Sequence, residues 1–166
     1  MPIIEPVTVY VWKFRGKNVA WGHASMSIGS LYISWWPRPD NRQGTSKLSD
    51  QIYRAPAFED RTYQEDVIAE GMKEDHRIII PPGLDTAAMK SSYGSMAGRL
   101  GFFGPPAPWE TQVRNCSTVV AQTLKAGGGD EYASWWSQRS RLIWSPNNVR
   151  DYAMSIREGL RKANAK

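Results

Sequence analysis

Cys116 is the single cysteine of this 166-residue chain, in the stretch RNCSTVVAQTL. The apolar spacing of Val119, Val120 and Leu124 predicts a helix that begins near this cysteine and ends at a run of three glycines. A thiol in the first turn of a helix has a lowered pKa, because the free backbone N–H groups and the helix dipole stabilise the thiolate. The same N–H groups can bind the oxyanion of a tetrahedral intermediate. Cys116 is therefore a candidate nucleophile; the alternative is a buried cysteine that packs as a small hydrophobic residue.

A nucleophilic thiol needs a base, and the chain has two histidines. His23 lies in VAWGHASMSI, where alternation puts it on the polar face of a predicted strand, beside a glycine that removes bulk. His76 follows KED, which is typical of a solvated turn. His23 is the predicted base, and the alternative is a core histidine bonded to a backbone carbonyl.

A third residue should hold the imidazole in the correct tautomer. Ser34, in YISWW, lies on the next predicted strand, across a short turn from His23. Asp40, just past that strand, is the alternative if the following loop folds back.

The elements that must position these residues are an early sheet and later helices. Strands are predicted over residues 7–14, 19–28 and 31–36, and together they form an antiparallel meander. Residues 37–62 read as a long surface loop, and residues 63–74 as a short helix or a turn. HRIII predicts a further strand, and Asp85 and Ser145 are the predicted N-caps of two more helices.

Composition is that of one domain spanning residues 1–166. One cysteine excludes an internal disulfide framework and a multi-cysteine zinc site, and neither a metal nor another cofactor is expected. No apolar run is long enough to span a bilayer, and the N-terminus lacks the features of a secretory signal. The net charge of +5 is scattered, and eight tryptophans either cover a small core or line a cleft.

Two motifs in this order, WGHASMSIGSLYISWWP and then NCSTVVAQTLKAGG, resemble the circularly permuted branch of the NlpC-type, papain-like cysteine hydrolases. With PGLD between them, they are more narrowly similar to members found among type VI secretion effectors and polymorphic toxins. The resemblance covers about residues 7–152. It implies an α+β fold with an antiparallel sheet packed against helices. It also implies that Cys116 is the nucleophile, His23 the general base and Ser34 the third residue, where better-known branches carry His, Asn or Asp.

Three functions are compatible with these sequence features. The first is a cysteine amidase or endopeptidase that forms an acyl-enzyme and cleaves peptide amides of peptidoglycan. Such an antibacterial effector would be made in the cytoplasm, delivered to the target-cell periplasm by a secretion apparatus, and neutralised by a cognate immunity protein. The second function is a lipid esterase, acyltransferase or protein deamidase on the same site, with Trp35, Trp36 and Trp109 contacting the substrate. The third is a basic, tryptophan-rich binding module, although no recognised nucleic-acid motif is present. Neither nucleic acid nor stable membrane insertion is expected.

Overall fold

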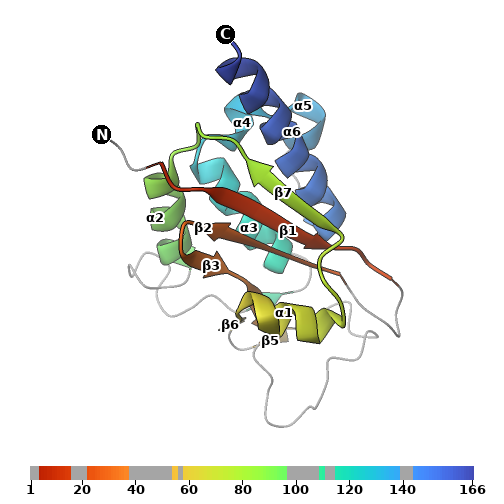
Figure 1. Ribbon diagram of the computed structural model, residues 1–166. Helices are drawn as coiled ribbons and strands as arrows, with labels where there is room; N and C mark the ends of the chain where they lie inside the picture. The colour runs from red at the N-terminus through yellow and green to blue at the C-terminus, as the bar shows by residue number, and fades with distance from the viewer. Residues whose placement is uncertain are drawn as a thin grey trace.

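The computed structural model describes residues 4–15, 22–37, 54–55, 58–96, 109–110, 115–138 and 144–166. Its centre is an antiparallel sheet of the order β3-β2-β1-β7. The four strands are β1 (Val7–Trp12), β2 (His23–Ile28), β3 (Leu31–Ile33) and β7 (His76–Ile80). The predicted meander is confirmed, and the HRIII strand joins it beside β1 (Figure 1).

Two further strand pairs lie outside this sheet. The short strand β4 (Trp35–Pro37) pairs with β6 (Phe58–Asp60), and β5 (Arg54–Ala55) pairs with β8 (Trp109–Glu110). The third predicted strand is therefore broken at Ser34, which lies between β3 and β4. The stretch predicted as a loop contains two of these short strands.

The described helices are α1 (Tyr63–Glu70), α2 (Thr86–Met96), α3 (Cys116–Ala126), α4 (Gly129–Tyr132), α5 (Trp135–Gln138) and α6 (Pro146–Asn164). Three of them begin with capping boxes, at Thr62, Asn115 and Ser145. Ser145 as N-cap with Pro146 in the first turn confirms the predicted start of α6. Within the described residues, none of these helices is both long and apolar enough to cross a bilayer.

The core lies between one face of the sheet and the helices α3 and α6 (Figure 1). Alternate residues of β1, namely Val7, Val9 and Val11, point into this core and are at most 3% exposed. Apolar residues of α3 and α6 meet them from the other side, among them Val120, Leu124 and Ile156. This layer carries most of the apolar burial, and it fixes α3 against β2.

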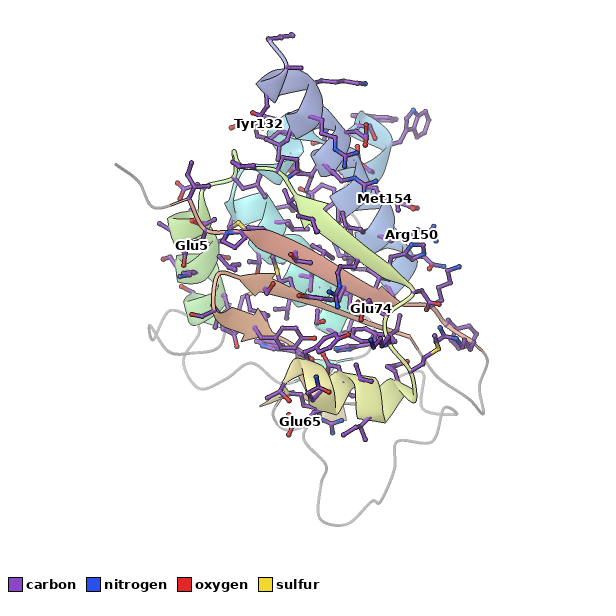
Figure 2. All side chains as sticks on the ribbon, viewed as in Figure 1. Glu5, Glu65, Glu74, Tyr132, Arg150 and Met154 are labelled. Atoms are coloured by element: carbon purple, nitrogen blue, oxygen red, sulfur yellow. The ribbon has the colours of Figure 1, made fainter. Side chains whose placement is uncertain are left out.

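The opposite face of the sheet is covered at one end by α1. Tyr63 of α1 packs its ring against Tyr10, Trp12 and Tyr32, with ring centroids 5.4 to 6.4 Å apart. The outer side of α1 carries Glu65, which is labelled in Figure 2. The inner side of α1 therefore faces the polar residues of β2 and β3.

Candidate active site

The N-terminus of α3 is fixed by its N-cap, Asn115. The Asn115 side-chain oxygen accepts a hydrogen bond from the backbone N–H of Thr118 at 2.9 Å, and the side-chain amide donates to the Trp144 carbonyl at 3.1 Å. Asn115 thus connects α3 to the segment just before α6. Cys116 is the first residue of α3 and is partly exposed. The helix starts where the sequence predicts, and it carries the thiol in its first turn.

The start of β2 is open on the side that faces α3. Strand β3 pairs only with Met26 to Ile28 of β2, so within the described residues no strand covers His23, Ala24 and Ser25 on that edge. The sulfur of Cys116 instead lies close enough to the backbone N–H of Ala24 for that dipole to lower the thiol pKa. The N-terminus of α3 therefore occupies the place where a longer β3 would lie, and this brings Cys116 beside His23.

Gly22 immediately precedes His23 and has a φ of 82°, in the left-handed region. A Cβ at this position would lie 2.9 Å from the backbone nitrogen of Phe14 and from the carbonyl oxygen of Trp12. Glycine therefore allows the chain to enter β2 close against the end of β1. Trp12 pairs with His23 in this register.

A hydrogen-bonded chain runs from His23 through Ser34 to Asp66. The His23 Nε2 and Ser34 Oγ atoms are 2.8 Å apart, and Ser34 Oγ donates to Asp66 Oδ1, also at 2.8 Å. Because the Ser34 hydroxyl proton goes to Asp66, Nε2 must be the donor to Ser34. The other carboxylate oxygen of Asp66 is 3.3 Å from Nε2. Nδ1 is therefore the ring nitrogen that remains for an interaction with the neighbouring thiol of Cys116.

Asp66 on α1 is completely buried and surrounded by donors. Its carboxylate accepts hydrogen bonds from the Tyr32 hydroxyl and from the Trp36 indole N–H, both at 2.6 Å, in addition to the Ser34 bond. Burial by itself would raise the pKa of Asp66, but the interactions with His23, Tyr32 and Trp36 outweigh it and lower the pKa. Asp66 is therefore an ionised carboxylate that holds the imidazole in one orientation.

The thiol and the imidazole favour each other's charged form. Burial would raise the pKa of Cys116, but the positive charge and hydrogen bond of His23 lower it. For His23, burial would lower the pKa, and the negative charges of Cys116 and Asp66 together with their hydrogen bonds raise it to about 10. The two opposite shifts favour a thiolate beside an imidazolium.

Aromatic rings enclose the imidazole. Trp36 stacks on His23 with ring centroids 4.5 Å apart and an interplanar angle of 27°, and the ring of Trp12 lies 5.6 Å away. The guanidinium of Arg61 lies 4.4 Å above the Trp36 ring. His23 is only 1% exposed in this setting. The polar chain that orients the imidazole is thus shielded from bulk water, which strengthens its electrostatic interactions.

The other predicted site residues fall in different places. Trp35 is 2% exposed and belongs to the hydrophobic core, so it cannot contact a substrate unless the core opens. Only the backbone of Trp109 is described, in β8, and Asp40 lies outside the described residues. His76 lies on β7 opposite Val11, not in a solvated turn. Among the described residues, no three His, Cys, Asp or Glu side chains gather where they could hold a metal ion.

Glu70 lies one helical turn after Asp66 and is the second buried acid of α1. Within the described residues, its Oε2 atom is buried without a hydrogen-bond partner. Burial raises the pKa of Glu70, and this outweighs the opposing effect of the positive charges of His23 and Arg15. Asp66 and Glu70 therefore differ sharply: the first is saturated with donors, and the second is ionised only at a cost in stability.

We expect Glu70→Gln to stabilise the protein by about 1 kcal/mol at neutral pH, which raises Tm by about 2–4 °C. A carboxyl whose pKa is raised by folding carries no penalty below the unfolded pKa of about 4.3, and destabilises the fold as pH rises through the folded pKa. The gain should therefore be greatest at neutral pH and vanish near pH 4, as measured by thermal unfolding across pH. Glu131→Gln, at an exposed glutamate, is the matched control and should leave Tm unchanged. A lower Tm for Glu70→Gln would mean that the carboxylate makes a stabilising bond.

The family model described as "IcsB middle domain" matches residues 73–166, which is more than half of the chain. The chain belongs to the IcsB middle-domain family. The matched segment contains Cys116, but it begins after His23, Ser34 and Asp66. The imidazole and the residues that orient it thus lie in the part of this IcsB middle-domain chain that the family model does not cover.

Two curated relatives of this IcsB middle-domain chain are large toxins. The "Multifunctional-autoprocessing repeats-in-toxin" proteins of Vibrio vulnificus and Vibrio cholerae are each 29% identical to it over 84 residues, which is 51% of this chain. The matched region is 2% of the length of either toxin. No solved structure matches the chain. The similarity is thus to a short part of each of these two toxins.

Proposed function

We propose that this protein is a cysteine acyl-transfer enzyme of the papain-like, permuted NlpC type. Cys116 is the nucleophile, His23 is the general acid and base, and Asp66 orients His23 both directly and through Ser34. The observation that carries the proposal is the hydrogen-bonded chain from Asp66 through Ser34 to His23, with the Cys116 thiol so close to His23 that each group shifts the pKa of the other. A buried structural cysteine does not require an oriented imidazolium beside it.

The proposed reaction has two steps. In the first, the Cys116 thiolate attacks the carbonyl carbon of an acyl donor, a carbon–sulfur bond forms, and the bond to the leaving group breaks. His23 gives the proton on Nδ1 to that leaving group. In the second step, His23 takes a proton from the acceptor, which attacks the thioester, and the thiolate is regenerated.

The first turn of α3 supplies candidates for an oxyanion site. The N–H of Thr118 bonds to the Asn115 side chain, and the N–H of Val119 bonds to the Asn115 carbonyl. The N–H groups of Cys116 and Ser117 precede both of these bonds at the positive end of the helix dipole. They are the groups we propose to stabilise the developing negative charge on the substrate oxygen.

The surroundings of His23 favour an acceptor other than water. An imidazole that is 1% exposed and stacked under Trp36 has little room for the bulk water that would hydrolyse a thioester. The indole ring of Trp36, which is partly buried and stacked on His23, also suits the hydrocarbon part of a lipid ester or thioester. We therefore favour transfer of an acyl chain to a hydroxyl or amine acceptor. The runner-up is an amidase or endopeptidase acting on peptidoglycan, which uses the same first step.

The family supports a role as a bacterial toxin or secreted effector module. Delivery by a secretion apparatus to the target-cell periplasm and neutralisation by a cognate immunity protein are part of this proposal.

The test is to capture the acyl-enzyme. Wild-type protein is incubated separately with long-chain acyl thioesters, phospholipid vesicles and purified peptidoglycan, quenched with acid, and examined by intact mass and peptide mapping. We expect an acyl adduct on Cys116 with a lipid-type donor, released faster by hydroxylamine than by water. Release of muropeptides instead would support the runner-up. If no donor acylates Cys116 while the protein keeps a biological effect that survives Cys116→Ala, the proposal is wrong.

A further inference from the structure

Trp36 contacts both the imidazole of His23 and the carboxylate that orients it. Its ring stacks on the imidazole with centroids 4.5 Å apart and 27° between the planes. Its indole N–H donates to Asp66 Oδ1 at 2.6 Å. One side chain therefore fixes both the plane of the base and the position of its carboxylate partner. The ring face makes one contact and the N–H the other, so substitutions can separate them.

The backbone around Trp36 holds the ring in place. Its neighbour Trp35 is 2% exposed in the core, and alternation along β4 turns Trp36 to the opposite side. Trp36 pairs with Glu59 of β6. Directly after β6, the backbone N–H of Arg61 donates to the Ser34 carbonyl at 3.2 Å, and the Arg61 guanidinium lies 4.4 Å from the centre of the indole. The ring is thus positioned by the fold itself, before a substrate binds.

The charged groups around His23 come from two helices. Burial lowers the pKa of His23, and Cys116 on α3 and Asp66 on α1 oppose this and favour the imidazolium. Burial raises the pKa of Glu70, one turn further along α1, and the charge of His23 opposes that shift. Among these groups the indole of Trp36 is the one that lies against the face of the imidazole. The negative face of an aromatic ring attracts a cation, so this stack also favours the charged form of His23.

We propose that Trp36 is a positioning residue that holds the imidazole of His23 in one plane and stabilises its positive charge. This role, which rests on the proposed function, matters most in the second step. There the acceptor oxygen or nitrogen bonds to the acyl carbon, the carbon–sulfur bond breaks, and the acceptor proton goes to Nδ1 of His23. While Cys116 is acylated, its sulfur carries no negative charge to favour the imidazolium. Asp66 and the face of Trp36 remain to stabilise the charge that develops as the proton arrives.

The first measurement is the pH profile of Cys116 alkylation, which needs no substrate. Trp36→Leu removes both the ring face and the N–H, and should move the midpoint of the profile upward by about one pH unit. Trp36→Met, a second side chain without a ring, should do the same. Trp36→Phe keeps a ring face but no N–H, and should stay close to the wild-type profile. Trp136→Leu, at a tryptophan that is 67% exposed on α5, is the matched control and should change nothing.

The second measurement follows the acyl-enzyme during turnover by intact mass, with an acyl thioester as donor. Loss of the ring face should slow transfer to the acceptor by about tenfold, so that acylated Cys116 accumulates in Trp36→Leu and Trp36→Met. Trp36→Phe should accumulate much less of it. Damage to the fold alone would lower the amount of acyl-enzyme, because acylation itself would fail.

The two measurements distinguish this role from the proposed function as a whole. Wild-type Cys116 that is labelled like an ordinary thiol would contradict the proposed function itself. Labelling of the wild type at low pH, together with an unchanged profile in the folded variants without a ring, would overturn only the role of Trp36. Equal shifts in Trp36→Leu and Trp36→Phe would overturn it too, because the N–H bond to Asp66 would then account for the whole effect. Thermal unfolding of each variant shows which of them are folded.

Discussion

Replacing His23 with alanine is expected to abolish turnover and to move the alkylation of Cys116 to higher pH. The thiolate depends on the imidazolium beside it, and without that charge the burial of the sulfur raises its pKa above the ordinary value of about 8.5. Iodoacetamide should label wild-type Cys116 at pH values well below 8.5, and His23→Ala only near or above it. Turnover should fall by roughly 10⁴-fold or more, because nucleophile and base act as a unit.

The other histidine provides the control for this result. His76→Ala should leave both the alkylation profile and turnover unchanged, since His76 lies on β7 and takes no part in the chain of hydrogen bonds around Asp66. Cys116→Ala should remove labelling and activity and keep the fold. If Cys116→Ala and His23→Ala instead lose thermal stability to the same large extent, and wild-type labelling follows an ordinary thiol, then the pair is a structural contact.

Asp66→Asn is expected to cost far more activity than Ser34→Ala. The amide has no charge to stabilise the imidazolium, and its NH₂ group must face a donor, because Tyr32, Ser34 and Trp36 all donate to this position. Turnover should fall by about 10²- to 10⁴-fold. Ser34→Ala leaves Asp66 Oδ2 at 3.3 Å from His23 Nε2, so a loss of about tenfold is expected.

The pH profile distinguishes orientation of the base from general damage to the fold. Asp66→Asn should shift the alkylation profile of Cys116 upward, because a less stabilised imidazolium lowers the thiolate fraction. Glu70→Gln, at the next buried acid of the same helix, should leave that profile almost unchanged. Equal losses in Ser34→Ala and Asp66→Asn would instead make the serine the main orienting residue, as the sequence pattern alone predicts.

Local sequence rules predict the elements that carry His23 and Cys116, and so make both residues candidates. Strand alternation puts His23 on the polar face of β2, and a cap followed by an apolar stripe starts α3 at Cys116. Ser34 follows from its place in the meander. That the residues meet depends on long-range packing of α3 against β2, for which the order of the two motifs in the resemblance was the only guide.

Asp66 was missed because the burial of α1 runs against its hydrophobic pattern. Its two buried residues are the acids Asp66 and Glu70, whereas Ile68 is 78% exposed. A prediction from the apolar residues alone would place Ile68 on the buried face of α1. The polar residues on the opposite sheet face supply enough donors to bury a carboxylate, and local sequence does not reveal this. The capping box at Thr62 could have identified the helix, but not which face it buries.

The short third strand has a consequence for solubility as well as for chemistry. An unpaired stretch of strand edge is a template on which another chain can add, and proteins usually protect such edges. At the start of β2 this protection comes from the N-terminus of α3, where the Cys116 sulfur lies against the backbone N–H of Ala24. Variants in which α3 detaches from β2 will therefore expose an aggregation-prone strand edge along with Cys116. Loss of activity and self-association should arise together in them.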